Sequence, residues 1–355
     1  MPKRILLVLA VIAAMHLVLY ISFMFFGKAV IISQVEKNLK LKADMQSASL
    51  SFPLSVRISK LDIKDLVKAD LISIRPSILG FLAGKIVLSE LRIVNPDITI
   101  VKDADGKLNL PQLEQEGKRP PFFLTGLTIE RGRLVFIDRK ISPEGNQVIV
   151  NDITAHISKA AFPPTSLFTK FNISASLAGN DNNPSGSALV SGWVDFRSKD
   201  MDGAIALKDI SGGVLSAYFQ NIVPDKKLLS AKLNFTADLK AKNNDLTAKC
   251  HLEFSNPVPI KQAESGEQGS SAGVVPQILN LFSDASGNIA FDFMINTKLD
   301  KPKIDVVNLK GSIGGAAARN IADQPTEEVV EKVKSAAKEF KELGKSLKEI
   351  FKKEE

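Results

Sequence analysis

Apolar and polar residues alternate with a period of two through the middle of the chain. The segment Leu246-Thr-Ala-Lys-Cys-His-Leu-Glu-Phe254 alternates strictly, and the segments Phe171–Leu177, Leu233–Leu239 and Ile289–Ile295 behave likewise. Successive side chains of a β-strand point to opposite faces of its sheet, so each segment predicts a strand with one apolar and one polar face. Long helix-period patterns are missing between about Leu50 and Val275, which disfavours a parallel sheet built from strand–helix–strand units.

Short turn-forming pairs interrupt these alternating segments. Asp-Gly, Asn-Pro, Arg-Gly and Ser-Gly recur along the chain, and such pairs are typical of hairpins and meanders. The sequence therefore predicts a mainly β fold, with an elongated antiparallel sheet over residues 49–310.

A long apolar segment lies near the N-terminus. From Ile5 to Phe26 the only clearly polar residues are His16 and Ser22. About 22 helical residues rising 1.5 Å each reach roughly 33 Å, enough to cross a hydrocarbon core of about 30 Å. The apolar segment continues through Phe23–Phe26, which makes it longer than a signal-peptide core. We therefore expect an uncleaved transmembrane anchor over residues 1–28, followed by a connector helix over residues 29–48.

The charges around this segment bear on its orientation. Lys3 and Arg4 precede it, and Lys28 and Lys37 are among the basic residues that follow, so the positive-inside count is nearly balanced. A short basic N-terminus usually stays in the cytoplasm, and a long C-terminal body is translocated largely regardless of its charges. We expect a single-pass protein with an extracytoplasmic body.

The C-terminal segment returns to helical periodicity. From Pro325 onward, apolar residues recur at steps of three and four: Val329, Val333, Ala336, Phe340, Leu343, Leu347 and Ile350. This spacing predicts an amphipathic helix over residues 325–355. Packing against the chain's own sheet, binding a partner helix and lying on a membrane surface remain alternatives for it.

Recognised catalytic and metal-binding motifs are missing from the sequence. It has three histidines and one cysteine, Cys250, and lacks His-x-x-x-His and Cys-x-x-Cys spacings. It also lacks the nucleophile elbow, the P-loop and the dinucleotide-binding glycine pattern. Asp103 and Asp105 lie in a predicted turn, where aspartate is favoured by local hydrogen bonds. We predict no catalytic residue, no metal site and no cofactor, and hence a protein that is not an enzyme.

The basic residues are spread along the chain rather than clustered. The formal net charge is +7, but no run of Lys and Arg is interleaved with aromatic residues, which argues against nucleic acid as a partner. A mild attraction to anionic lipid headgroups is consistent with this charge.

An ordered series of motifs is more specific than composition. The segment from Gly84 to Ile100 contains Asn95-Pro96 and leads into Asp105-Gly-Lys-Leu-Asn-Leu110; Leu127–Asp138 and Leu299-Asp-Lys-Pro-Lys-Ile304 follow. This order resembles the AsmA-like family of bacterial envelope proteins, most closely over residues 1–160. The resemblance implies a body that projects from the bacterial inner membrane into the periplasm, with its sheet curled lengthwise into an open groove. It also implies a role in moving phospholipid between membranes or in outer-membrane homeostasis.

A groove would need an apolar lining, which the alternating segments can supply. Candidate lining residues are Ile86, Leu88, Ile98, Ile100, Ile129, Phe136, Phe171, Ile173, Phe235, Leu252, Phe254, Phe291 and Phe293. At ~0.8 kcal/mol per methylene, exposing about 15 methylenes of an acyl chain to water costs roughly 12 kcal/mol, which an apolar trough would largely remove. The alternative is a sealed β-core, which would make the protein a non-transporting envelope scaffold.

The C-terminal helix is our candidate for docking to another envelope protein. The residues that would make the contact are Val329, Val333, Phe340, Leu343, Leu347 and Ile350.

Overall fold

The structure of the chain is a computed structural model. It describes residues 3–51, 54–111, 122–162, 168–178, 184–214, 231–255 and 288–300. These residues form a mixed sheet of fourteen strands and two helices, which confirms a mainly β fold with an N-terminal helix. The expected helix over residues 325–355 lies outside the described residues.

The chain divides into two compact units, and β8 (Asn146–Phe162) is shared between them. Unit 1 contains α1 (Lys3–Leu39), β1 (Ala43–Asp44), β2 (Ser47–Ser51), β3 (Ser55–Ile63), β4 (Val67–Pro76), α2 (Ile78–Leu82), β5 (Ile86–Val94), β6 (Asp97–Lys102) and β7 (Phe122–Asp138). Unit 2 contains β9 (Thr169–Ala178), β10 (Pro184–Asp195), β11 (Asp200–Ser211), β12 (Lys232–Lys242), β13 (Asp245–Ser255) and β14 (Ile289–Lys298).

Helix α1 is continuous from Lys3 to Leu39. The connector helix expected over residues 29–48 is therefore only the last part of α1, and residues 43–44 and 47–51 belong to strands instead. The serines of the sequence SASLS explain the difference, because serine favours a helix less than it favours local hydrogen bonding in other conformations. Residues Leu17–Leu39 are long and apolar enough to cross a membrane.

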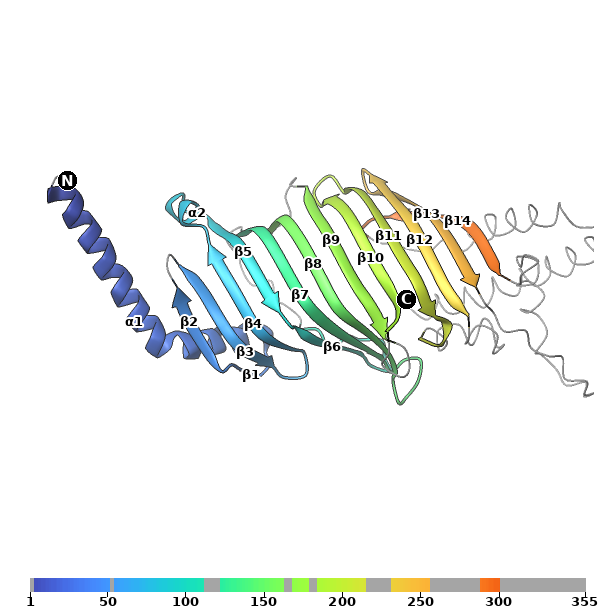
Figure 1. The fold of residues 1–355 in the computed structure, drawn as a ribbon, viewed down its shortest axis with the longest axis horizontal. Coiled ribbons are helices and arrows are strands. Elements are labelled where there is room, and N and C mark those ends of the chain that lie inside the picture. The colour runs from blue at the N-terminus through green and yellow to red at the C-terminus, as the bar shows by residue number, and fades with distance from the viewer. Residues whose placement is uncertain are drawn as a thin grey trace, which may run out of the picture. The chain divides into compact units, whose positions relative to one another are not determined.

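The two parts of α1 have different surroundings. Five consecutive residues from Leu17 to Ile21 are each 42–63% exposed. Because successive helical residues are rotated by about 100°, these five cover the whole circumference, so no described part of the chain covers the helix there. Further along, Ile31, Ile32, Val35 and Leu39 pack against a buried cluster in the sheet of unit 1. Figure 1 shows these last turns of α1 beside β1–β3.

The buried cluster of unit 1 consists of Met45, Ile58, Leu61 and Ile63. Its spacing in β3 departs from strict alternation, because Ile58 and Leu61 are three residues apart and both are buried. Lys60 lies between them with φ of 50°, in the left-handed region. A residue in this conformation rotates the strand locally, so the apolar residues on both sides of it reach the same cluster.

Two strand pairs in unit 1 are parallel, which corrects the expectation of a wholly antiparallel sheet. Strand β7 pairs in parallel with β5 and then with β6. Strands β5 and β6 both pair antiparallel with β4, so they follow one another in the same direction. Asn95-Pro96 between them is therefore a break in an extended segment and not the chain-reversing turn that we expected. Asn95 has φ of 49°, and Pro96 has no N–H to donate to a neighbouring strand.

The Arg131-Gly132 pair is likewise not a turn, because it lies inside the 17-residue strand β7. Arg131 has φ of 50° and continues a row of polar side chains across the sheet. Asp70 accepts hydrogen bonds from Asn95 Nδ2 at 2.7 Å and Lys60 Nζ at 2.6 Å, and Arg131 Nε donates to Asn95 Oδ1 at 2.9 Å. The bonds from Asn95 and Lys60 hold the pKa of Asp70 below its usual value. Polar side chains thus occupy the positions where the strands change their alternation.

Unit 2 is an antiparallel meander, and Figure 1 shows β9–β14 side by side in chain order. All four segments that alternate strictly in the sequence are strands in this unit: β9, β12, β13 and β14. Each was predicted from its alternation, and each prediction is confirmed.

A close approach of two glycines in unit 2 leads to a stability prediction. Gly192 has φ of 152°, and a Cβ added there would lie 2.4 Å from the carbonyl oxygen of Asp202 and 2.6 Å from Cα of Gly203. We expect Gly192→Ala to destabilise unit 2 by roughly 2–4 kcal/mol, because β10 and β11 must separate to admit the methyl group. Thermal unfolding followed by circular dichroism measures this. Gly126→Ala is the control, since its nearest neighbour is 3.8 Å away; an equal loss of stability in both variants would contradict the prediction.

Candidate functional site

Three apolar rows cross unit 2 from β9 to β14 on one face of the sheet. They follow from the strand register, because directly paired residues share a face. The first row is Phe171, Gly192, Gly203, Leu239, Ala248 and Ile295. The second is Ile173, Val190, Ile205, Ala237, Cys250 and Phe293. The third is Ala175, Ala188, Leu207, Phe235, Leu252 and Phe291. We call these three rows the unit 2 face.

Six predicted lining residues meet on this face: Phe171, Ile173, Phe235, Leu252, Phe291 and Phe293. A seventh, Phe254, lies in the next row and pairs with Leu233. The side chains of the intervening positions are mainly polar or charged, as His251 and Asp292 illustrate with their 2.8 Å contact. Alternation in four segments therefore identified one common face, although it could not show which residues are neighbours.

Burial differs between the unit 2 face and the row beside it. Ile173, Phe235 and Phe293 are half-buried, and the rings of Phe235 and Phe293 lie 6.5 Å apart. In the next row, by contrast, Ile210 is 0% exposed and Leu233 is 4% exposed. Ile173, Phe235 and Phe293 on the unit 2 face thus retain accessible apolar surface, whereas Ile210 and Leu233 in the adjoining row belong to a sealed core.

Phe171 has a structural task as well. Its Cζ lies 3.0 Å from the position that a Cβ on Gly192 would occupy and 3.6 Å from that on Gly203. The ring therefore covers two glycines on neighbouring strands and shields their backbone. Phe171 is accordingly a poorer reporter of ligand binding than Phe235 or Phe293.

The lining residues predicted in unit 1 separate into two groups. In the first group, Ile129 pairs with Ile93, and Ile98 pairs with Val67 on one side and Leu134 on the other. Both rows continue across β4 to β3, where they end in the buried cluster that packs against α1. Ile100 pairs with Phe136 in the same strands. All of these side chains are half-buried.

Ile86 and Leu88 form the second group. They lie beyond a register shift between β4 and β5, where they pair with Phe122 and Leu124. Ile86 is 49% exposed. These two residues therefore do not extend the rows that contain Ile98 and Ile129.

Cys250 lies at the centre of the unit 2 face. It is 5% exposed and belongs to a buried cluster with Ala237 and Ala248, against which Phe293 packs. Burial raises the pKa of the Cys250 thiol, because the thiolate is poorly solvated there. The residue can serve as a chemical reporter of this face.

The raised pKa gives a pH-dependent prediction. Only the thiolate is alkylated rapidly, so Cys250 should react with iodoacetamide several-fold more slowly at pH 8 than an exposed thiol. The pH at which the alkylation rate of Cys250 increases should also be higher than the corresponding pH for the exposed thiol. Asp105→Cys in a Cys250→Ala background is the control, because Asp105 is exposed in a turn. Overlapping pH–rate profiles for the two positions would contradict the burial of Cys250.

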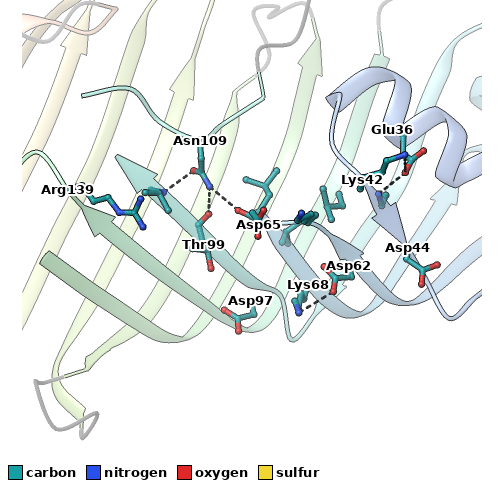
Figure 2. Close-up of a pocket in the computed structure, with 16 residues that line it drawn as sticks. Glu36, Lys42, Asp44, Asp62, Asp65, Lys68, Asp97, Thr99, Asn109 and Arg139 are labelled. Atoms are coloured by element: carbon teal, nitrogen blue, oxygen red, sulfur yellow. Dashed lines mark hydrogen bonds and ion pairs between the residues drawn. The ribbon is translucent and has the colours of Figure 1, made fainter. Parts of the chain in front are cut away.

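A pocket of about 860 Å³ lies at the end of unit 1 where the β3–β4 turn meets the end of α1. Figure 2 shows its charged rim, which includes Glu36, Asp62, Lys68 and Arg139. Several of these charges are already paired. Lys68 contacts Asp62 at 3.2 Å, and Glu36 accepts a hydrogen bond from the N–H of Ala43 at 3.2 Å. None of the predicted lining residues borders this pocket, and its charged, paired rim does not suit an acyl chain.

Asn109 connects the pocket wall to its surroundings (Figure 2). Its side-chain oxygen accepts from the N–H of Val101 at 2.9 Å. Its Nδ2 donates to the carbonyls of Asp65 at 3.0 Å and Thr99 at 3.1 Å. Asp103 closes the preceding turn by accepting from the N–H of Lys107 at 2.8 Å. The Asp-Gly-x-x-Asn-Leu motif thus fastens the segment after β6 to the β3–β4 turn, which explains why it needs an asparagine.

Within the part of the chain that the structure describes, no group of three or more His, Cys, Asp and Glu side chains is arranged to hold a metal ion. Comparisons with protein families, with curated proteins and with solved structures find no match for this chain.

Proposed function

We propose that the protein is a membrane-anchored lipid-binding protein that takes part in phospholipid transfer or outer-membrane homeostasis, with the apolar faces of its sheet as the binding surface. The observation that carries the proposal is the unit 2 face, in which three apolar rows cross six strands and the large side chains whose exposure is described are half-buried. The resemblance to AsmA-like proteins supports the same function.

The chemistry of this face suits an acyl chain. Its members in β9–β14 are aliphatic, aromatic, glycine or cysteine residues, so they offer contact to methylene groups without requiring hydrogen bonds. At ~25 cal/mol per Å², covering about 300 Å² of apolar surface would contribute roughly 7 kcal/mol before the cost of ordering the lipid. The small residues Ala237 and Ala248 are covered by the larger side chains of the neighbouring strands, which therefore form the accessible part of the face.

Helix α1 supports membrane anchoring. Its apolar side chains from Leu17 to Ile21 are exposed on all sides, which suits lipid surroundings and would be costly in water. We infer a single-pass protein of the bacterial inner membrane with its body in the periplasm, an orientation that rests on the N-terminal charges and on the resemblance.

A non-transporting envelope scaffold is the second candidate. The sealed row containing Ile210, Leu233 and Phe254 favours it, because these residues are at most 6% exposed, as in an ordinary protein core. In that case the unit 2 face would be covered by protein, and any partner would dock elsewhere, for example through the segment 325–355.

Lipid analysis distinguishes the two candidates. The fragment 28–355 omits the exposed apolar side chains from Leu17 to Ile21 but keeps the turns that pack against Met45 and Ile58. Expressed in bacteria, purified without detergent and extracted for mass spectrometry, it should carry phospholipid in a reproducible molar ratio. A folded fragment that carries none would reject lipid binding and favour the scaffold.

A further inference from the structure

The loop between β4 and β5 exposes an apolar surface outside the unit 2 face. It comprises α2 and the residues that follow it as far as Ile86. Leu79 and Leu82 are 79% and 77% exposed, more than any other large apolar residue whose exposure is described, and Ile78 and Ile86 are 45% and 49% exposed. Adjacent exposed apolar side chains of this size usually mark a contact surface.

The loop holds this conformation by specific contacts. Ser77 Oγ accepts a hydrogen bond from the N–H of Gly80 at 3.1 Å, and the N–H of Lys85 donates to the carbonyl of Gly80 at 2.9 Å. The N–H of Ser77 donates to the carbonyl of Val87 at 2.8 Å, which joins the start of the loop to β5. Gly80 itself packs closely on Val87, since an added Cβ would lie 2.7 Å from that side chain. The backbone is thus built to direct the leucines outward.

The charge of the loop indicates what it contacts. No acidic residue occurs from Ser77 to Ser89, and Lys85 is exposed. The nearest carboxylate along the chain, Glu90, is paired with Arg75 at 2.7 Å. Apolar side chains accompanied by a basic residue and no acid match the interface of an anionic bilayer, where leucines enter the acyl region and lysine meets the headgroups.

We propose that this loop inserts Leu79 and Leu82 into the interfacial layer of the membrane in which α1 is anchored. The inference rests on the proposed anchoring, because the loop can meet a bilayer only if α1 holds its own compact unit, to which α2 also belongs, at a membrane. A single helix leaves the body free to tilt and rotate, whereas a second, shallow contact fixes its orientation against the bilayer.

The test uses the full chain with one environment-sensitive probe. A cysteine is introduced by Leu82→Cys in a Cys250→Ala background and labelled with a nitrobenzoxadiazole fluorophore. The labelled protein is then reconstituted into vesicles of phosphatidylethanolamine and phosphatidylglycerol. Some lipids carry a nitroxide near the top of the acyl chain. Leu19→Cys reports the anchor, and Asp105→Cys reports an exposed turn outside both contacts. We expect the probe at Leu82 to be blue-shifted and mostly quenched, and that at Asp105 to be neither.

Each outcome has a distinct meaning. A probe at Leu82 that behaves like that at Asp105, while the probe at Leu19 is quenched, overturns the loop contact and leaves the anchor intact. Failure of quenching at Leu19 as well overturns the anchor. A blue shift at Leu82 that grows with protein density and is not quenched by lipid would show contact with a second copy, and would also overturn the proposal. Adding Leu79→Ser should reduce quenching at Leu82 without affecting that at Leu19.

Discussion

Replacing Phe293 with aspartate in the fragment 28–355 is expected to weaken binding of a short-chain fluorescent phospholipid by roughly 2–4 kcal/mol, or roughly 30- to 1,000-fold. Phe293 lies in the middle row of the unit 2 face, beside Cys250 and 6.5 Å from the ring of Phe235. The substitution removes apolar contact and places a carboxylate where an acyl chain would lie. Fluorescence titration below the critical micelle concentration of the lipid measures the change.

The neighbouring residue gives the matched control. Met294 is 39% exposed and points to the opposite face of β14, so Met294→Asp should leave lipid affinity within about twofold, as for surface substitutions in general. Circular dichroism establishes that both variants are folded. Equal affinity in the two variants would contradict binding on the unit 2 face.

Truncating Ile210 to alanine is expected to destabilise unit 2 by about 2–5 kcal/mol, because a fully buried side chain leaves a cavity. Ile210 is 0% exposed, whereas Leu207, on the unit 2 face, is half-buried. Leu207→Ala should cost only on the order of 1 kcal/mol in lipid-free protein, since less surface is removed from contact. Urea unfolding of the fragment 28–355 can be followed through Trp193, the chain's single tryptophan, which lies in β10 of the same unit.

The pair also tests whether the face is open. If Leu207→Ala costs as much as Ile210→Ala in the absence of lipid, the unit 2 face is a sealed core and the scaffold alternative gains support. If lipid binds only the native state, adding lipid should raise the unfolding midpoint of the unsubstituted fragment. The rise in midpoint should be smaller for the Leu207→Ala variant.

Strand identity could be predicted where the evidence was local. The segment Leu246–Phe254 alternates strictly because the apolar side chains of β13 lie beside those of the neighbouring strands on one face, while its polar side chains lie on the opposite face. The same held for β9, β12 and β14. Alternation also selected residues such as Ile173 and Phe293 that the register brings into one row.

Pairing and direction could not be predicted, because they depend on residues distant in sequence. Asn95-Pro96 and Arg131-Gly132 have turn-forming composition, yet the first breaks an extended segment without reversing it and the second lies within β7. A left-handed residue can end a strand or merely rotate it, and the choice depends on its partners. Here Asn95 bonds to Asp70, which is 25 residues away, and to Arg131, which is 36 residues away.

The exposed loop around α2 was also missed as a surface. The sequence from Ile78 to Ile86 does not show which of its side chains face solvent. The hydrogen bonds of Ser77 and Gly80 decide that, because they close the loop with its leucines outward.

Site-specific photocrosslinking along β14 tests lipid binding most directly. A benzophenone amino acid is placed in turn at positions 292, 293, 294 and 295 of the full chain, which is then irradiated in living bacteria and analysed by mass spectrometry. Strand geometry places Phe293 and Ile295 on the unit 2 face and Asp292 and Met294 on the other. We predict phospholipid adducts at 293 and 295 and none at 292 and 294. Adducts that are absent or equal at all four positions, or protein adducts alone at 293 and 295, would contradict a lipid-binding face.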